Sequence, residues 1–246
     1  MKKLTLMAIT ATMVSLGAQG QGLVTFGNSA GLTSRISVNT TFGGAATGQY
    51  AAGAAGTYYF ALFYSTTATT VNGNANAFYP TLTSVGNYVW NDTNWHFAGG
   101  SSGQQTYTLN GNIFSSDGYA ASTGAAGRML STLYTSESVE SESVVGLAAG
   151  ATAQFVVVGW SSNMGTTYGA VESFLTSGNV TTGMYLGESA VGAPTVTGDN
   201  FLNASPTIMA ATVVPAFTLG LYAIPEPSTM VLVGLGGLSL LLFRRR

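Results

Sequence analysis

The stretch Thr57-Tyr58-Tyr59-Phe60-Ala61-Leu62-Phe63-Tyr64-Ser65 predicts a β-strand at the centre of a sheet. Successive side chains of a strand point to opposite faces, so the even-numbered and odd-numbered residues form two separate faces. Both faces are apolar here, which indicates a strand that is covered on both sides. The run Ala153-Gln154-Phe155-Val156-Val157-Val158-Gly159-Trp160 has the same property and predicts a second central strand.

Shorter β-prone runs, separated by turns rich in Gly, Asn, Ser and Thr, surround these two stretches. They cover residues 23–26, 35–39, 88–90, 106–109, 184–186, 207–214 and 217–223. Apolar residues at 168, 171, 174 and 175 form one helical face, and Gly178 is a suitable end for a short helix. We therefore expect an all-β domain of the β-sandwich or jelly-roll type with one short helix.

The composition of the chain argues against nucleic-acid binding and excludes cysteine chemistry. Only 7% of the chain is charged, and residues 21–224 carry two basic side chains against eight acidic ones, a formal charge of −6. A negative surface disfavours nucleic acid, because phosphate binding needs basic side chains. The chain has no cysteine, so disulfides and thiol chemistry are excluded and burial must stabilise the fold.

The N-terminus has the three parts of a secretory signal. Lys2 and Lys3 precede an apolar run at residues 4–16, and Ala18 and Gly20 are small residues at the positions that signal peptidase reads. We expect a signal peptide at residues 1–20, cleaved by signal peptidase before Gln21. The alternative is an uncleaved anchor, for which the apolar run is short.

The C-terminus combines Pro225-Glu226-Pro227-Ser228-Thr229, an apolar run at residues 230–243 and the terminal residues Arg244, Arg245 and Arg246. The run predicts a transmembrane helix at about residues 229–243. Its apolar part would rise about 21 Å, which is short for a hydrocarbon core of roughly 30 Å. The arginines would stop the helix on the cytoplasmic side. An ordinary tail anchor is the alternative.

The order of motif, helix and basic end resembles the PEP-CTERM sorting signal, over about residues 224–246. The resemblance implies processing by exosortase, a transpeptidase-like membrane protease of Gram-negative bacteria, in cells that produce exopolysaccharide. It also implies that Pro225, Glu226 and Pro227 are recognition residues. The opening at residues 18–26 and the Gly/Ala/Thr-rich middle additionally resemble proteins with this tail from the Verrucomicrobia and Planctomycetes.

Catalytic and metal sites find little support. His96, the only histidine, lies near Asp92, but no Gly-x-Ser-x-Gly elbow supplies a nucleophile. One histidine without cysteine excludes the usual zinc and copper sites. Glu137, Glu140 and Glu142 form an acidic cluster, which is either a calcium site or a solvated loop. Glu172 and Glu188 are a possible pair of glycosidase carboxylates. We expect no enzyme activity, no metal and no cofactor.

Trp90 and Trp95 are the candidate ligand contacts. If these rings are exposed, they can stack on the faces of sugars. The alternative is that they pack in the core as alternating residues of a strand. A carbohydrate-binding module for the cell's own exopolysaccharide is therefore the second functional hypothesis, and a secreted hydrolase the third.

The sequence thus predicts three regions: a signal peptide at 1–20, an exported β-sandwich domain at 21–224 and a sorting signal at 225–246. The precursor would be anchored in the membrane, with signal peptidase and an exosortase-like protease as partners. The product would be a non-enzymatic protein of the cell surface or extracellular matrix.

Overall fold

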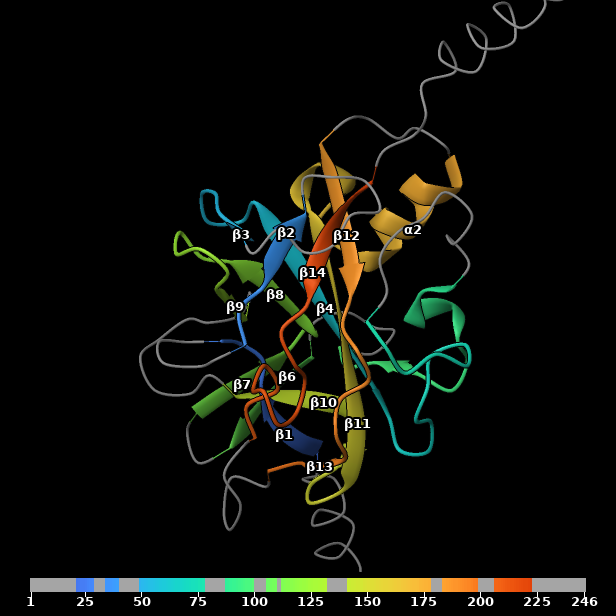
Figure 1. Cartoon of the computed structure of the whole chain (residues 1–246). Helices are drawn as coiled ribbons and strands as arrows, with labels where there is room; N and C mark the ends of the chain where they lie inside the picture. Colours follow the sequence, from blue (N-terminus) through green and yellow to red (C-terminus); the bar gives the residue numbers. More distant parts are fainter. Residues whose placement is uncertain are drawn as a thin grey trace, which may run out of the picture.

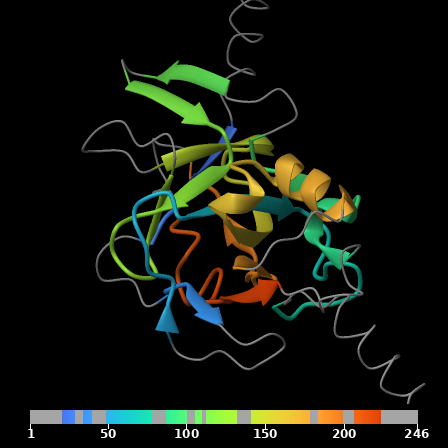
Figure 2. The ribbon, with the colours of Figure 1, turned by 90° about the horizontal axis from the view of Figure 1, so that it is seen from above.

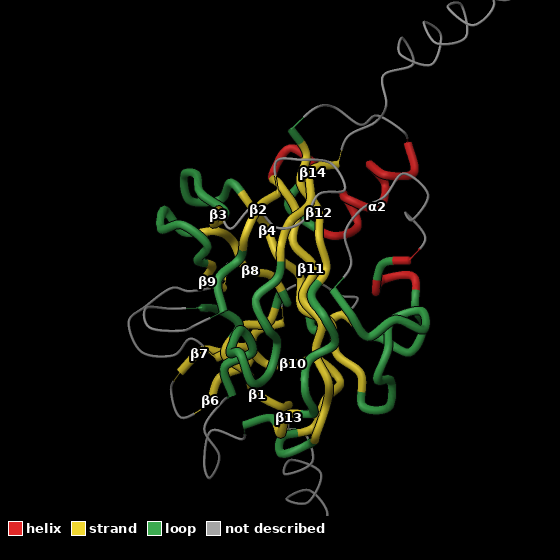
Figure 3. Tube along the Cα trace, viewed as in Figure 1, coloured by secondary structure: helices red, strands yellow, loops and turns green. Residues whose placement is uncertain are grey.

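The computed structural model describes residues 21–28, 34–39, 49–77, 87–99, 105–109, 112–131, 141–177, 183–198 and 206–222. These residues form an all-β structure with one α-helix, α2 (Tyr168–Ser177), and two short 3-10 helices (Figures 1 and 3). The predicted all-β class with a short helix is confirmed for this part of the chain. The predicted signal peptide and tail helix lie outside the described residues.

A curled sheet of ten strands forms the main body (Figure 1). Its neighbours are antiparallel except for β14 and β2, which run parallel. The path is β3 (Gln49–Tyr50), β2 (Ser37–Asn39), β14 (Thr218–Tyr222), β12 (Met184–Glu188), β11 (Thr152–Ser161), β4 (Tyr58–Ser65), β8 (Tyr119–Ser122) and β9 (Met129–Ser131), with β13 (Thr195–Val196) on β11 and β5 (His96–Phe97) on β4.

Two further pairs of strands complete the β structure. β1 (Gln21–Thr25) pairs with β10 (Ser141–Ala148), and β6 (Gln105–Leu109) pairs with β7 (Asn112–Ser116). Backbone hydrogen bonds also tie β1 to the chain before β14: the Leu23 N–H donates to the Gly198 carbonyl over 3.0 Å, and the Thr25 N–H donates to the Pro206 carbonyl over 2.8 Å.

β4 and β11 pair in continuous register from Tyr58↔Ser161 to Ser65↔Gln154. Their side chains alternate between two hydrophobic clusters, one on each face of the sheet. Phe60, Leu62, Phe155 and Val157 belong to the first cluster, and Ala61, Phe63, Val156, Val158 and Trp160 belong to the second. Both predicted central strands are therefore confirmed, with their two faces covered.

Different elements cover the two faces. The first cluster includes Val24 of β1, Val144 of β10 and Ile208 from the loop before β14. The second includes Val171 and Leu175 of α2, and Val89 of η2 (Val89–Asn91). The predicted helical face is thus confirmed, and α2 lies beside the sheet in Figure 2.

Two predicted strands are wrong. Tyr88 is the N-cap of the 3-10 helix η2, and Val89 and Trp90 are its first two residues; hydrogen bonds from the Asn91 N–H to the Tyr88 carbonyl and from the Asp92 N–H to the Val89 carbonyl close it. Residues 207–214 form consecutive tight turns instead of a strand. In both segments, apolar side chains are buried without strand backbone, so tertiary packing overrides β propensity.

Strand structure also occurs where the sequence suggested loops. Residues 115–127, rich in Gly, Ser and Ala, are not among the predicted strands, but β7 extends to Ser116 and β8 spans Tyr119–Ser122. The small residues Ala120 and Ala121 of β8 pair with Phe60 and Tyr59 of β4. Small side chains beside large aromatic ones pack well in a sheet, yet they give no hydrophobic pattern in the sequence.

The close packing of β12 on β14 gives a first prediction. A Cβ at Gly187 would collide with the Thr218 carbonyl oxygen of β14, which is backbone and cannot rotate away. We expect Gly187→Ala to lower the free energy of unfolding by about 1–3 kcal/mol, measured by chemical denaturation.

The matched control is Gly169→Ala in α2, where a Cβ meets no atom within 4 Å. Alanine favours helix over glycine by up to about 1 kcal/mol, so this variant should be unchanged or more stable. Equal stabilities of the two variants would show that β12 and β14 do not pack this closely.

Candidate functional site

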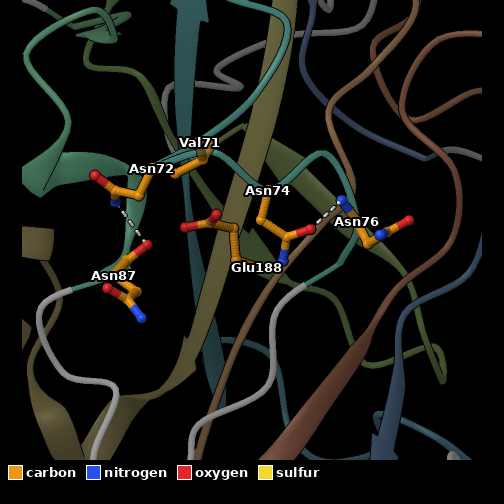
Figure 4. Close-up of a pocket in the computed structure, with 6 residues that line it drawn as sticks. All are labelled: Val71, Asn72, Asn74, Asn76, Asn87 and Glu188. Atoms are coloured by element: carbon orange, nitrogen blue, oxygen red, sulfur yellow. Dashed lines mark hydrogen bonds between the residues drawn. The ribbon is translucent and has the colours of Figure 1, made fainter.

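A small polar cavity lies where three segments of the chain meet. Its volume is about 50 Å³, and it is lined by Val71, Asn72, Asn74, Asn76, Asn87 and Glu188 (Figure 4). The first four residues follow β4, Asn87 precedes η2, and Glu188 is the last residue of β12. Sequence analysis considered Glu188 only as one acid of a glycosidase pair and missed the four asparagines.

A tight turn shapes the cavity wall. Val71 and Asn74 exchange two backbone hydrogen bonds of 2.8 Å, and the two residues between them have positive φ, 47° at Asn72 and 83° at Gly73. An Asn-Gly pair is the preferred sequence for such a two-residue turn. This dipeptide was the sequence signal that could have located the loop.

Hydrogen bonds connect the turn to the neighbouring segment. The Asn72 Nδ2 donates to the Asn87 carbonyl over 2.9 Å, as Figure 4 shows. The Asp92 carboxylate accepts from the Asn72 N–H over 2.8 Å, and from the Asn94 N–H over 3.0 Å. Burial raises the pKa of Asp92, but these hydrogen bonds outweigh it and the net pKa is lowered. Asp92 therefore stays ionised and fixes two loops.

Glu188 is the chemically distinctive group of the cavity. It is only 2% exposed, and its Oε2 accepts a hydrogen bond of 2.8 Å from the Val89 N–H. Burial, with a smaller contribution from the negative charge of Asp92, raises its pKa to about 8 despite that hydrogen bond. In the absence of a bound cation, Glu188 is therefore mostly protonated at pH 7.

A wider polar recess adjoins the cavity and shares Asn72 with it. The recess is lined by Thr67, Ala68, Thr69, Thr70, Asn72, Gly73, Asp92 and Asn94. Behind it lies Trp95, which is 5% exposed and donates its indole N–H to the Thr70 carbonyl over 3.0 Å. Trp95 therefore supports the wall of the recess from within.

Trp90 has a different environment from Trp95. Its ring stacks on Tyr88 with centroids 4.6 Å apart, and it lies nearly parallel to Tyr168 of α2 at 6.5 Å. Trp90 remains partly exposed, whereas Trp95 belongs to the buried core cluster. The two candidate glycan contacts are thus not equivalent surface rings, and sugar binding by them stays a prediction.

The structure does not assemble the catalytic sets considered from sequence. His96 packs against the ring of Tyr64, while both carboxylate oxygens of Asp92 accept hydrogen bonds from asparagines. Glu172 is exposed on α2, in contrast to the buried Glu188. Within the described ranges, no three His, Asp or Glu side chains gather as metal ligands.

The acidic segment at residues 136–143 is described only in part. Glu142 lies in β10, opposite Val24 of β1. The C-terminal end of the acidic segment is therefore a strand and not a loop. Glu137 and Glu140 lie outside the described residues. The calcium alternative for this segment stays a prediction.

The sorting residues Pro225, Glu226 and Pro227 also lie outside the described residues, as do Ala18 and Gly20 of the signal-peptidase site and the terminal arginines. The described chain ends in β14, which pairs with β12 on one side and β2 on the other. Two residues, Ala223 and Ile224, separate this internal strand from Pro225.

Comparison with known proteins identifies the tail. Residues 223–246 match the family model of the PEP-CTERM protein-sorting motif. Neither the curated proteins nor the solved structures gave a match to this chain. The described part of the chain contains no helix that is both long and apolar enough to span a membrane. The chain therefore carries a sorting signal, which implies export and processing by an exosortase-like enzyme; the resemblance to Verrucomicrobia and Planctomycetes proteins stays a prediction.

The raised pKa of Glu188 gives a second prediction. The pKa of Glu188 is about 8 in the folded protein, against 4.5 for an unperturbed glutamate. Between these two pH values the folded protein therefore keeps a proton that the unfolded chain releases. The contribution of Glu188 to stability therefore falls as the pH rises from about 4.5 to 8. Glu188→Gln cannot ionise, so in metal-free buffer its stability relative to wild type should rise by about 2–4 kcal/mol across this window.

Chemical denaturation at about pH 5 and pH 8 measures this difference. Glu172→Gln, on the exposed face of α2, is the control and should follow the wild type at both values. A Glu188→Gln variant that also follows the wild type would show that the carboxyl is not shielded from water.

Proposed function

We propose that this chain is the precursor of a non-enzymatic protein of the cell surface or extracellular matrix. The observation that carries the proposal is the sorting motif at residues 223–246, which begins directly after the last strand of the folded body. A sorting signal at this position requires that the β domain itself be the exported cargo.

The proposed pathway has three steps. Signal peptidase removes residues 1–20 and leaves Gln21 as the first residue. The helix at about residues 229–243 then holds the precursor in the inner membrane, with Arg244 to Arg246 on the cytoplasmic side. An exosortase-like enzyme recognises Pro225, Glu226 and Pro227 and releases the body, which becomes associated with exopolysaccharide outside the cell.

The composition of the described body supports a role outside the cell. Among the large hydrophobic side chains whose exposure the structure describes, only Val196, at 53%, is strongly exposed. The surface of the body depends on Thr, Ser and Asn more than on charge, and its core forms without disulfides. In this proposal the ribbon β1–β10 is the second layer of the predicted β-sandwich, since Val24 and Val144 face the first core cluster.

The sorting motif gives a third prediction, tested in the protein's own cells. Wild type should begin at Gln21, lack the residues after the Pro-Glu-Pro motif and leave the inner membrane. Glu226→Ala should retain Arg246 and remain in the inner-membrane fraction, because the recognition motif is lost. Intact mass and cell fractionation measure both properties.

The matched control is Glu172→Ala, which removes an exposed carboxylate from α2 and leaves the tail unchanged. It should be processed as wild type. If the wild type also retains Arg246 and stays in the membrane, the tail is a plain anchor and the proposed processing is wrong.

A further inference from the structure

None of the described residues that line the cavity at Glu188 belongs to the sorting motif, and the chemistry of this cavity departs from the expectation that the chain has no metal site. We propose that this cavity binds one calcium ion, with the Glu188 carboxylate as its charged ligand. The site would join the loop after β4 and the segment before η2 to the end of β12. This proposal does not depend on the processing of the tail.

The first argument is the environment of the carboxylate. Glu188 is buried, and within the described residues only its Oε2 accepts a hydrogen bond, from the Val89 N–H. The carboxyl group faces the cavity in Figure 4, where the other described residues of the lining are Val71 and four asparagines. A buried carboxylate without a positive partner is costly, and a cation in the cavity would compensate its charge.

The charge of the domain strengthens this argument. The described residues contain two basic side chains, Arg35 and Arg128, and neither lines the cavity. Asp92 acts on Glu188 with the same negative sign. The described residues therefore create a negative potential in the cavity, and a bound cation would supply the compensating positive charge.

The second argument is the arrangement of amide groups. Asn72, Asn74 and Asn76 alternate along one loop, the same spacing that places successive oxygen ligands in calcium-binding loops. The Asn74 Oδ1 accepts a hydrogen bond of 3.0 Å from the Asn76 N–H, which folds the loop around the cavity. In Figure 4 the side chains of Asn72 and Asn74 lie on either side of Glu188, and rotation of either amide, at the cost of its present hydrogen bond, would turn its oxygen toward an ion at the carboxylate.

The third argument is size. A cavity of about 50 Å³ is too small for a sugar ring but has room for one ion with one or two water molecules. Water would complete the six to eight oxygens that calcium takes. The adjoining recess gives solvent a route to the shared residue Asn72.

The ligand chemistry favours calcium over other cations. Carboxylate and amide oxygens suit hard cations, whereas zinc and copper prefer nitrogen or sulfur ligands, and the described residues of the lining offer no such ligand apart from amide nitrogen. Magnesium requires a near-regular octahedron and gives up water reluctantly, so an irregular asparagine-lined cavity fits it poorly. With one charged ligand, we expect a Kd of about 10⁻⁴–10⁻³ M, the range of extracellular calcium modules.

Terbium luminescence and thermal unfolding of the full-length chain in detergent test the proposal. Terbium replaces calcium in oxygen sites, and Tyr88 and Trp90 lie close to Asn87 in sequence as donors of excitation energy. Wild type should show sensitised luminescence that calcium displaces and magnesium displaces poorly. Calcium at about 10 mM should raise its Tm by roughly 3–8 °C.

The variants separate this site from others. Glu188→Gln nearly preserves side-chain shape but removes the charge, and it should weaken terbium and calcium binding at least tenfold. Asn74→Ala removes an amide that lies beside Glu188 in Figure 4 and should weaken binding less, which provides a second measure if Glu188→Gln folds poorly. Glu172→Gln is the surface control and should bind as wild type.

Two results would overturn the proposal. One is a wild-type Tm that calcium leaves unchanged, together with no calcium-displaceable terbium signal. The other is equal binding by wild type and by Glu188→Gln and Asn74→Ala, which would place the ion elsewhere, for example at the acidic residues Glu137, Glu140 and Glu142.

Discussion

The pairing of β4 with β11 is the interaction on which the rest of the structure depends. The two strands are registered from Tyr58↔Ser161 to Ser65↔Gln154, and both faces of both strands are buried. Neither disulfides nor an abundance of charges is available in this chain, so burial of apolar surface is the main source of stability. Because both central strands need cover on two sides, the remaining strands, the β1–β10 ribbon and α2 must be arranged around them.

The same constraint explains the position of the candidate site. Along β12, Met184 and Leu186 point toward the second core cluster, and strand alternation places Glu188 on that face as well. Glu188 lies opposite Val158 of β11 in the sheet register. A carboxyl group thus occupies a place where an apolar side chain would extend the core. The asparagine-rich turn at Asn72 and the N–H of Val89 close over it, which is why its environment differs from that of every surface acid.

The sequence predicted the parts of the fold that periodicity can encode, and missed those set by tertiary contacts. Two-sided apolar runs identified β4 and β11, and a helical face identified α2. The segment around Val89 and the loop containing Ile208 have strand-like composition, but their apolar side chains fill the core from turns. β8 escaped prediction because alanines beside Phe60 carry no pattern. The cavity was missed because Glu188 and Asn72, 116 residues apart in the chain, come together only through the fold.

The order of strands separates the residue before the sorting signal from the cavity, although β14 and the cavity both adjoin β12. Tyr222, the last described residue before the motif, pairs with Met184 at one end of β12, and Glu188 lies at the other end. Four residues of extended strand span about 13 Å, so the tail leaves the sheet well away from the cavity. Since β14 is held between β12 and β2, processing near Pro225 would leave the sheet complete. The body would therefore keep the same fold and the same cavity before and after its release from the membrane.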